Sequence, residues 1–189
     1  MNINLSQENN KQPTSYLSIG IDFGGVLSAH DSRSDKETGN HNLEINVPDA
    51  MNSLLTLKNN GHKLYLISFC GKKRAAETRE SIVKNAPGVF ETLYFVKSKD
   101  YKKNICKYLG LDVFIDDTLP ILVDVAKNIN NIHLIHFTGD EGFEPQGDTR
   151  LKNIVECSSW KDVVELCENI KPLGNAKETE NNLSKMLYI

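Results

Sequence analysis

Residues 16–27, YLSIGIDFGGVL, carry the strongest structural signal in the chain. Their first part is a short apolar run of the kind that forms a strand buried on both faces. Asp22 stands near the end of this run, and Gly24 and Gly25 follow it. A carboxylate at a strand end, followed by glycines, can approach a ligand together with exposed backbone amides. The stretch therefore predicts a buried strand that ends at a binding site.

Short apolar runs of the same type recur along the chain. They are rich in Ile, Val, Leu, Tyr and Phe, and together with the first run they predict strands at 16–23, 63–69, 92–96, 112–117 and 132–137. Amphipathic segments between them predict helices that start at Pro48, cover 74–85, 101–110 and 119–128, and start again at Ser159. This strict alternation predicts right-handed βαβ units. We expect a Rossmann-like, doubly wound three-layer α/β/α sandwich with a mostly parallel sheet.

The composition narrows the class of protein. With 189 residues, 39% hydrophobic and 25% charged, the chain has enough apolar residues for a core, which excludes collagen-like, disulfide-scaffold and wholly disordered classes. Its formal net charge of −3 argues against a dedicated nucleic-acid binder. The four cysteines lack metal-binding spacing, and neither an export signal nor a membrane-spanning apolar run is visible. We expect a cytoplasmic protein that does not bind membranes.

One α/β domain is expected over residues 16–171. Residues 1–15 are polar and rich in Asn, which predicts a disordered lead, and residues 172–189 predict a tail. The segment 28–47 is too long and too polar for an ordinary loop between a strand and a helix. It follows a strand end, where open α/β sheets bind ligands, so it is either a mobile substrate flap or a surface insertion.

More polar side chains stand where other predicted strands end. Asp116 and Asp117 follow one apolar run, and Ser68 stands near the end of another. Carboxylates buried at such positions need a cation or hydrogen-bond donors nearby. Three carboxylates in one crevice favour Mg²⁺, with phosphate as its partner ligand. Lys102 and Lys103, at the start of a predicted helix, each place an ammonium group within reach of this crevice.

In their order and spacing these groups resemble the haloacid dehalogenase superfamily of phosphohydrolases. The residues that carry the resemblance are IGIDFGGVL (19–27), LYLIS (64–68), Lys102 or Lys103, and VFIDDT (113–118). The resemblance extends over about residues 16–170. It implies the Rossmann-like fold predicted above, a Mg²⁺ cofactor and a phosphorylated substrate.

The resemblance also implies a role for each matching residue. Asp22 is the expected nucleophile, which takes up the phosphoryl group as an aspartyl-phosphate. The expected metal ligands are Asp22, Gly24 through its carbonyl group, Asp116 and Asp117. The expected phosphate-binding residues are Ser68, Gly25 and Phe69. Lys102, with Lys103 as the alternative, would neutralise charge shared by the nucleophile and the phosphate.

The sequence departs from the family pattern at Gly24. Phosphatases of the superfamily usually carry a second Asp two positions after the nucleophile, where it acts as general acid and base. Glycine cannot do this, and such help is worth about 10²–10⁴-fold in rate. His30 or Asp31 from the 28–47 segment would be a substitute. The short intervals between the motifs imply a nearly capless enzyme with an open site.

We therefore expect a Mg²⁺-dependent phosphatase that acts on an unknown phosphomonoester through an aspartyl-phosphate. The alternatives are a weak or inactive module that binds phosphate or a protein, a 5′-nucleotidase-like enzyme, and a dehalogenase.

Overall fold

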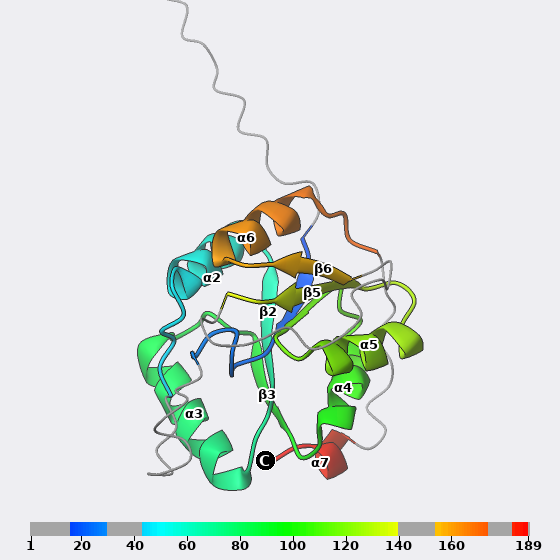
Figure 1. Cartoon of the computed structure of the whole chain (residues 1–189). Coiled ribbons are helices and arrows are strands. Elements are labelled where there is room, and N and C mark those ends of the chain that lie inside the picture. Colours follow the sequence, from blue (N-terminus) through cyan, green and yellow to red (C-terminus); the bar gives the residue numbers. More distant parts are fainter. Residues whose placement is uncertain (1–15, 30–42, 140–153, 174–182, 189) are drawn as a thin grey trace, which may run out of the picture.

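Six parallel strands form one sheet in the computed structural model of the chain (Figure 1). The structure describes residues 16–29, 43–139, 154–173 and 183–188. The strand order across the sheet is β3-β2-β1-β4-β5-β6, and every neighbouring pair is parallel. The strands are β1 (Ser18–Ile21), β2 (Lys63–Phe69), β3 (Thr92–Val96), β4 (Val113–Asp116), β5 (His133–Phe137) and β6 (Ile154–Cys157).

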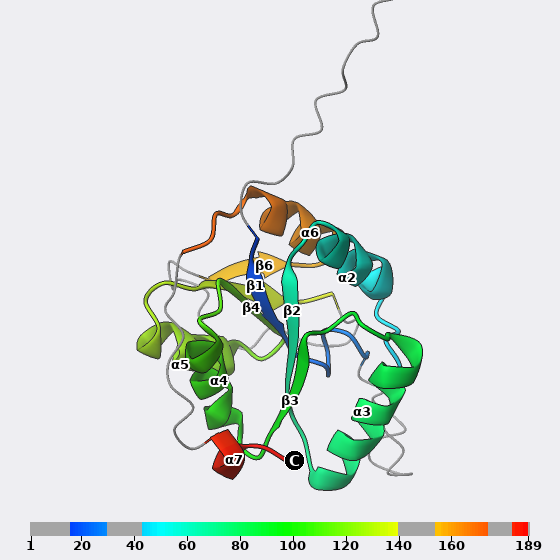
Figure 2. The same ribbon diagram turned by 180° about the vertical axis from the view of Figure 1, so that it is seen from behind.

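Helices connect the strands and cover both faces of the sheet (Figures 1 and 2). One face is covered by α2 (Ala50–Asn59), α3 (Lys72–Asn85) and α6 (Trp160–Asn169). The other face is covered by α4 (Lys102–Leu109), which a 3₁₀ turn η1 (Lys99–Tyr101) precedes, and by α5 (Leu119–Asn128). The short helix α7 (Leu183–Met186) lies beside the end of β3. The predicted three-layer α/β/α sandwich is confirmed.

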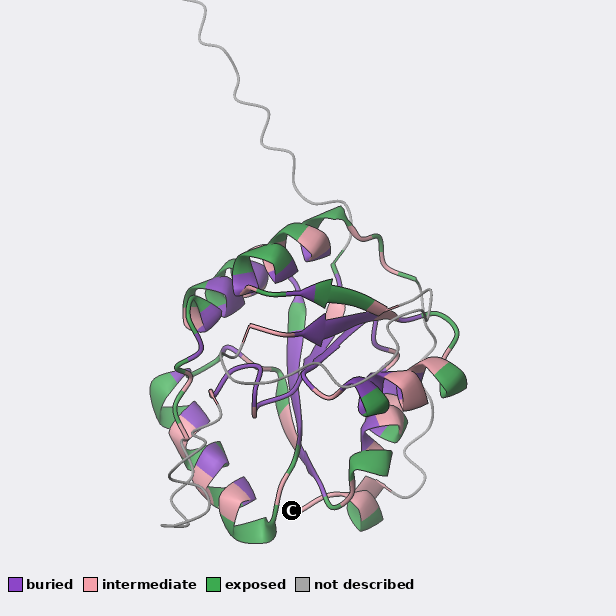
Figure 3. Cartoon of the chain, viewed as in Figure 1, coloured by how far each residue is buried: buried purple, intermediate pink, exposed green. Residues whose placement is uncertain are grey.

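The core consists of two apolar layers, one on each face of the sheet (Figure 3). Alternate strand residues supply the two layers, because successive side chains of a strand point to opposite faces. Ile19 and Ile21 of β1 belong to the layer under α2, α3 and α6, whereas Ile67 of β2 belongs to the other layer. Between the two isoleucines, a Cβ atom on Gly20 would lie 2.5 Å from Leu111 Cδ1. The second layer therefore packs directly on the backbone of β1, and any larger residue at this position would force its buried side chains to shift.

The chain reverses its direction of travel across the sheet at β1. It runs from β1 outward through β2 to β3, and then continues from the other side of β1 with β4, β5 and β6. The carboxyl ends of β1 and β4 are therefore neighbours, and the Asp22 N–H donates to the Ile115 carbonyl oxygen at 3.0 Å. In open α/β sheets, ligands bind at such a reversal point.

All five predicted strands are present, and β2 and β3 have the predicted bounds. The sixth strand, β6, was not predicted. It is a four-residue edge strand, Ile154–Cys157, in which Glu156 interrupts the apolar residues, so the sequence contains no continuous apolar run there. The helix predicted from Pro48 begins at Ala50, because Asp49 adopts a left-handed backbone conformation with φ 61°.

Residues 183–188 pack against the outer edge of β3. The Lys97 N–H donates to the Met186 carbonyl oxygen at 2.9 Å, and the Tyr188 N–H donates to the Phe95 carbonyl oxygen at 3.0 Å. Leu187 forms an antiparallel bridge with Val96. The end of the chain thus pairs with part of a strand edge that would otherwise be open.

Residues 1–15, for which a disordered lead is predicted, lie outside the described residues, as do residues 30–42 of the predicted flap or insertion. Across the part of the chain that the structure describes, every helix is too short or too polar to cross a membrane.

Candidate active site

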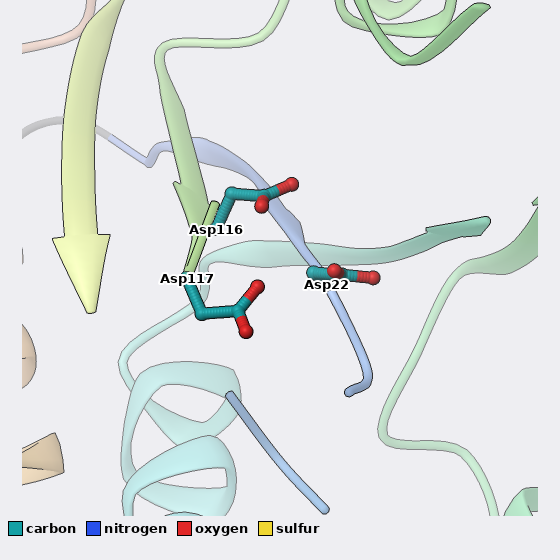
Figure 4. Close-up of side chains that lie close together, drawn as sticks. All are labelled: Asp22, Asp116 and Asp117. Atoms are coloured by element: carbon teal, nitrogen blue, oxygen red, sulfur yellow. The ribbon is translucent and has the colours of Figure 1, made fainter. Parts of the chain in front are cut away.

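Three carboxylates converge where β1 and β4 end (Figure 4). Asp22 follows β1, Asp116 is the last residue of β4, and Asp117 comes directly after it. One oxygen of each carboxylate lies within 4.8 Å of an oxygen of the other two. Asp116 is fully buried, whereas Asp22 and Asp117 keep small exposed fractions of 7% and 5%. The carboxylate cluster therefore meets solvent through Asp22 and Asp117.

Lys102, the first residue of α4, joins this cluster. Its Nζ lies 2.7 Å from Asp22 Oδ2 and 2.7 Å from Asp116 Oδ2, and the residue is 1% exposed. Burial by itself lowers the pKa of Lys102, but the carboxylates of Asp116 and Asp22 outweigh burial and raise that pKa above its ordinary value. Lys102 is therefore a charged group that links the ends of β1 and β4.

The cluster carries more negative than positive charge. Three carboxyl groups face one ammonium group, so the net charge of the cluster is −2 when all three carboxyl groups are ionised. Burial raises the pKa of Asp116 to about 7, while the Lys102 ammonium opposes this rise and the carboxylates of Asp22 and Asp117 add to it. A buried surplus of negative charge is costly without a further cation. Because carboxylate oxygens are the hard ligands that Mg²⁺ prefers, the residues present fit this ion.

Backbone and hydroxyl donors hold the carboxylates in position. Thr118, which precedes α5, donates its N–H to Asp116 Oδ1 at 2.9 Å and its hydroxyl group to Asp117 Oδ1 at 3.1 Å. The Phe23 N–H donates to Asp22 Oδ1 at 2.7 Å. Each carboxylate therefore has a donor that restricts its orientation, as is usual for groups that ligate metal ions.

The residues predicted to bind phosphate stand at the same edge of the sheet. Gly25 adopts φ 71°, which favours glycine, and its N–H donates to the Ser28 carbonyl oxygen at 2.8 Å in a tight turn after Asp22. The β1–β2 register places Ser68 near the carboxyl end of β2 beside this turn, where it is buried. Phe69, the last residue of β2, is 43% exposed.

The structure distinguishes between the two lysines that the sequence left open. Lys103 Nζ lies 2.8 Å from Asp124 Oδ2, on the adjacent helix α5, whereas Lys102 enters the carboxylate cluster. Because consecutive helical residues point in directions about 100° apart, only one of the two can face the site. His30 and Asp31, the predicted substitutes for an acid at Gly24, lie outside the described residues.

Cys70 lies close enough to Asp22 and Lys102 for their charges to act on its thiol group. Burial raises the pKa of Cys70 to about 11, so this thiol group is protonated at neutral pH. A protonated thiol is a poor nucleophile and a poor metal ligand. Cys70 therefore adds no reactive group to the site.

His136 is a neighbour of the site that the sequence patterns did not reveal. It is fully buried on β5, paired in register with Asp116, and its Nε2 lies 3.1 Å from the Asp117 carbonyl oxygen. A carbonyl oxygen only accepts, so Nε2 carries the hydrogen. Among the described residues, His136 Nδ1 has no hydrogen-bond partner. The histidine thus contacts the backbone that carries Asp117. Because every residue type has a backbone carbonyl group, the sequence does not indicate such a contact.

No protein-family model and no curated protein matches the sequence. Solved structures do match the fold. An uncharacterized protein from Listeria monocytogenes serotype 4b is 17% identical, with a TM-score of 0.58, over 82% of this chain and 99% of that chain. A Had-superfamily hydrolase from Ehrlichia chaffeensis is 12% identical, with a TM-score of 0.53, over 81% and 97% of the two chains.

A third solved structure is the D,D-heptose 1.7-bisphosphate phosphatase from B. bronchiseptica, complexed with magnesium and phosphate. It is 12% identical to this chain, with a TM-score of 0.53, and the match covers 79% of this chain and 97% of that chain.

Proposed function

We propose that this chain, which has the fold of the haloacid dehalogenase superfamily, is a Mg²⁺-dependent phosphohydrolase that acts on a phosphomonoester. The observation that carries the proposal is the convergence of Asp22, Asp116 and Asp117 at the reversal point of the sheet, with the Lys102 ammonium group in contact with Asp22 and Asp116. A structurally similar phosphatase was crystallised with magnesium and phosphate, which supports the same ligands here.

In this proposal Asp22 is the nucleophile. A carboxylate oxygen of Asp22 attacks the phosphorus atom, a new O–P bond forms, and the P–O bond to the leaving group breaks; the alkoxide that leaves takes a proton from water. Water then attacks the aspartyl-phosphate, which releases inorganic phosphate and restores the carboxylate. The Lys102 ammonium, 2.7 Å from Asp22 Oδ2, offsets the repulsion between the carboxylate and the incoming phosphate.

The remaining residues would hold the metal ion and the phosphoryl group. Asp22, Asp116 and Asp117, with the Gly24 carbonyl oxygen, are the proposed ligands of Mg²⁺. The metal ion supplies Lewis-acid polarisation of the phosphoryl oxygens. The proposed phosphate-binding groups are the Ser68 hydroxyl group and the backbone amide of Phe69. Gly25, which the sequence also suggested, is not among them, because its N–H already donates to the Ser28 carbonyl oxygen.

Hydrolysis of p-nitrophenyl phosphate tests this function. We expect Mg²⁺-dependent release of p-nitrophenol, which EDTA stops and which Asp22→Asn abolishes. The matched control is Asp124→Asn, the same chemical change at a half-exposed residue paired with Lys103 outside the site. Equal activity of wild type and Asp22→Asn would remove Asp22 from the mechanism.

Gly24 favours a second candidate function, a module that binds phosphate without turnover. Glycine offers no side chain to protonate the leaving group or to activate water, and such help is worth about 10²–10⁴-fold in rate. Mg²⁺-dependent binding of phosphate, measured by calorimetry, together with undetectable hydrolysis of p-nitrophenyl phosphate would support this candidate over the first.

A further inference from the structure

A groove of about 600 Å³ runs along the exposed side of α3. Its lining combines three cationic side chains with apolar ones, namely Lys72, Arg79 and Lys84 with Ala76, Val83 and Tyr188. A second hollow of about 300 Å³ shares Arg79 and Val83 with the first and continues toward the end of α3. Together they follow a helix of 14 residues, which is about 21 Å long.

Two aromatic contacts hold the walls of this groove in place. The Arg79 guanidinium group lies 5.2 Å from the ring centre of Phe95, a side chain that is 1% exposed. Tyr188 is attached to β3 by its backbone hydrogen bond to Phe95, and its ring lies 5.8 Å from Lys97 Nζ. The cation at Arg79 and the ring at Tyr188 are therefore positioned before any ligand binds, which lowers the entropic cost of binding.

The charge of the groove favours an acidic peptide segment. Lys72, Arg79 and Lys84 outweigh Glu80, so the lining carries a net charge of +2 on a chain whose net charge is −3. A nucleic acid would place phosphates along the whole groove and would meet the Glu80 carboxylate, which repels them. A peptide can instead place acidic side chains opposite the cations and apolar ones against Val83, which is 63% exposed.

The groove begins near the proposed active site. Lys72, at the start of α3, comes four positions after Ser68 near the end of β2, so their Cα atoms lie at most about 14 Å apart. Phe69 lies between them in sequence and offers an exposed ring. Figures 1 and 2 both show the start of α3, the end of β3 and the end of the chain side by side. An extended peptide crosses this distance with about four residues.

From these observations we propose that the groove along α3 binds an acidic segment of a phosphorylated polypeptide whose phosphoryl group occupies the site at Asp22. This inference rests on the proposed function and assigns a substrate class to it. Acidic residues that begin about four positions from the phosphorylated residue would lie against Lys72, Arg79 and Lys84.

Synthetic phosphopeptides test the proposal. In the first set, one peptide carries four Glu residues that begin four positions before a phosphoserine, and another carries them from four positions after it. In the second set, Ser or Lys replaces these Glu residues. We expect kcat/KM for one of the Glu peptides to exceed that for the Ser peptide about tenfold, mainly through KM. In the double variant Lys72→Glu/Lys84→Glu we expect this ratio to fall to about one.

The matched control is Lys73→Glu/Lys127→Glu, which changes the net charge equally. Lys73 pairs with Glu77 on the same helix, Lys127 is exposed on α5, and neither lines the groove. We expect this control to keep the wild-type ratio. A wild-type ratio of one, or an equal loss of the ratio in both double variants, would overturn the proposal.

A binding experiment separates this proposal from the proposed function. A fluorescent Glu peptide without phosphate should bind the wild-type protein, and Lys72→Glu/Lys84→Glu should weaken its anisotropy signal, whether or not the protein hydrolyses p-nitrophenyl phosphate. Binding of the peptide without hydrolysis of p-nitrophenyl phosphate would support the groove as a peptide site and contradict the proposed phosphatase activity. Hydrolysis without binding, or displacement of the peptide by an equally charged single-stranded oligonucleotide at lower concentration, would reject the groove as a peptide site.

Discussion

Among the lysines that the structure describes, Lys102 is the most deeply buried. It is 1% exposed and contacts carboxylates from the ends of two strands, Asp22 and Asp116. A buried ammonium group can persist only with such partners, and its removal leaves the carboxylates uncompensated. The same side chain therefore stabilises the fold and prepares the proposed nucleophile.

We expect Lys102→Met to lower kcat/KM for p-nitrophenyl phosphate by about 10²–10³-fold, the loss typical of a group that stabilises transition-state charge. In EDTA the variant should also be less stable by about 3–5 kcal/mol, because a buried ion pair is broken. Steady-state kinetics and urea unfolding measure the two effects.

Lys103→Met is the matched control, since Lys103 pairs with Asp124 at a half-exposed position. An exposed pair is worth about 0–1 kcal/mol, so little change is expected in either measurement. Equal effects of the two substitutions would contradict the assignment of Lys102.

The contact between His136 and the backbone of Asp117 leads to a separate prediction about metal affinity. Its Nε2–H donates to the Asp117 carbonyl oxygen, so His136→Leu should loosen the turn that carries Asp117 and weaken Mn²⁺ binding about 10–100-fold. His136→Gln, which keeps an N–H donor, should restore most of the affinity. Electron paramagnetic resonance of Mn²⁺ measures binding without reference to turnover.

The control for His136 is His133→Gln on the same strand, where the side chain points to the opposite face of the sheet. An unchanged Mn²⁺ affinity in His136→Leu would show that this histidine has no part in positioning Asp117.

Single residues show what the sequence could and could not predict about the site. Asp22 and Asp116 were predictable, because each follows a buried apolar run and the two runs were expected to end at one edge of a parallel sheet. The choice between Lys102 and Lys103 depends on how α4 is rotated, which the spacing does not define. His136 was missed because its partner is a backbone carbonyl group.

At the scale of elements, five of the six strands could be predicted from the sequence, the edge strand β3 among them, whereas β6 could not. The inner strands are buried on both faces and therefore appear as continuous apolar runs. The edge strand β6 has only four residues, of which the two in the middle are exposed, so its pattern is too weak to predict. The pairing of residues 183–188 with β3 was also invisible, because it rests mainly on backbone hydrogen bonds.

The contact between the chain end and β3 predicts a loss of stability in Leu187→Ala. Leu187 packs against the apolar layer under α4 and α5 and pairs with Val96, but it is only half-buried. We expect a loss of about 1–2 kcal/mol, less than the 2–5 kcal/mol typical of a fully buried leucine. Urea unfolding measures the change, and Ser184→Ala, an exposed position in α7, is the control. A loss in Ser184→Ala as large as that in Leu187→Ala would contradict the packing role.

At the scale of the whole molecule, metal binding and folding should be linked through pH. Burial raises the pKa of Asp116 to about 7 in the metal-free protein. Below pH 7 the proton on Asp116 would therefore compete with Mg²⁺ for the carboxyl group. Above pH 7 this group is ionised and would bind the metal ion without losing a proton. Ligands that bind only the folded state raise its stability in proportion to their affinity. We expect 5 mM Mg²⁺ to raise Tm more at pH 8 than at pH 6.

Differential scanning fluorimetry with and without Mg²⁺ measures this difference. In Asp116→Asn, which neither titrates nor supplies a charged ligand, the dependence on pH should disappear. The same rise in Tm at both pH values in the wild-type protein would indicate that Asp116 does not take part in metal binding.

The surplus of negative charge among Asp22, Asp116, Asp117 and Lys102 also has a kinetic consequence. With all three carboxyl groups ionised, the cluster has a net charge of −2 and repels a dianionic phosphate until a divalent cation has entered it. Binding should therefore be ordered, with the cation first and the phosphoryl compound second. Release should follow the reverse order, so that inorganic phosphate leaves while the cation stays behind for the next cycle.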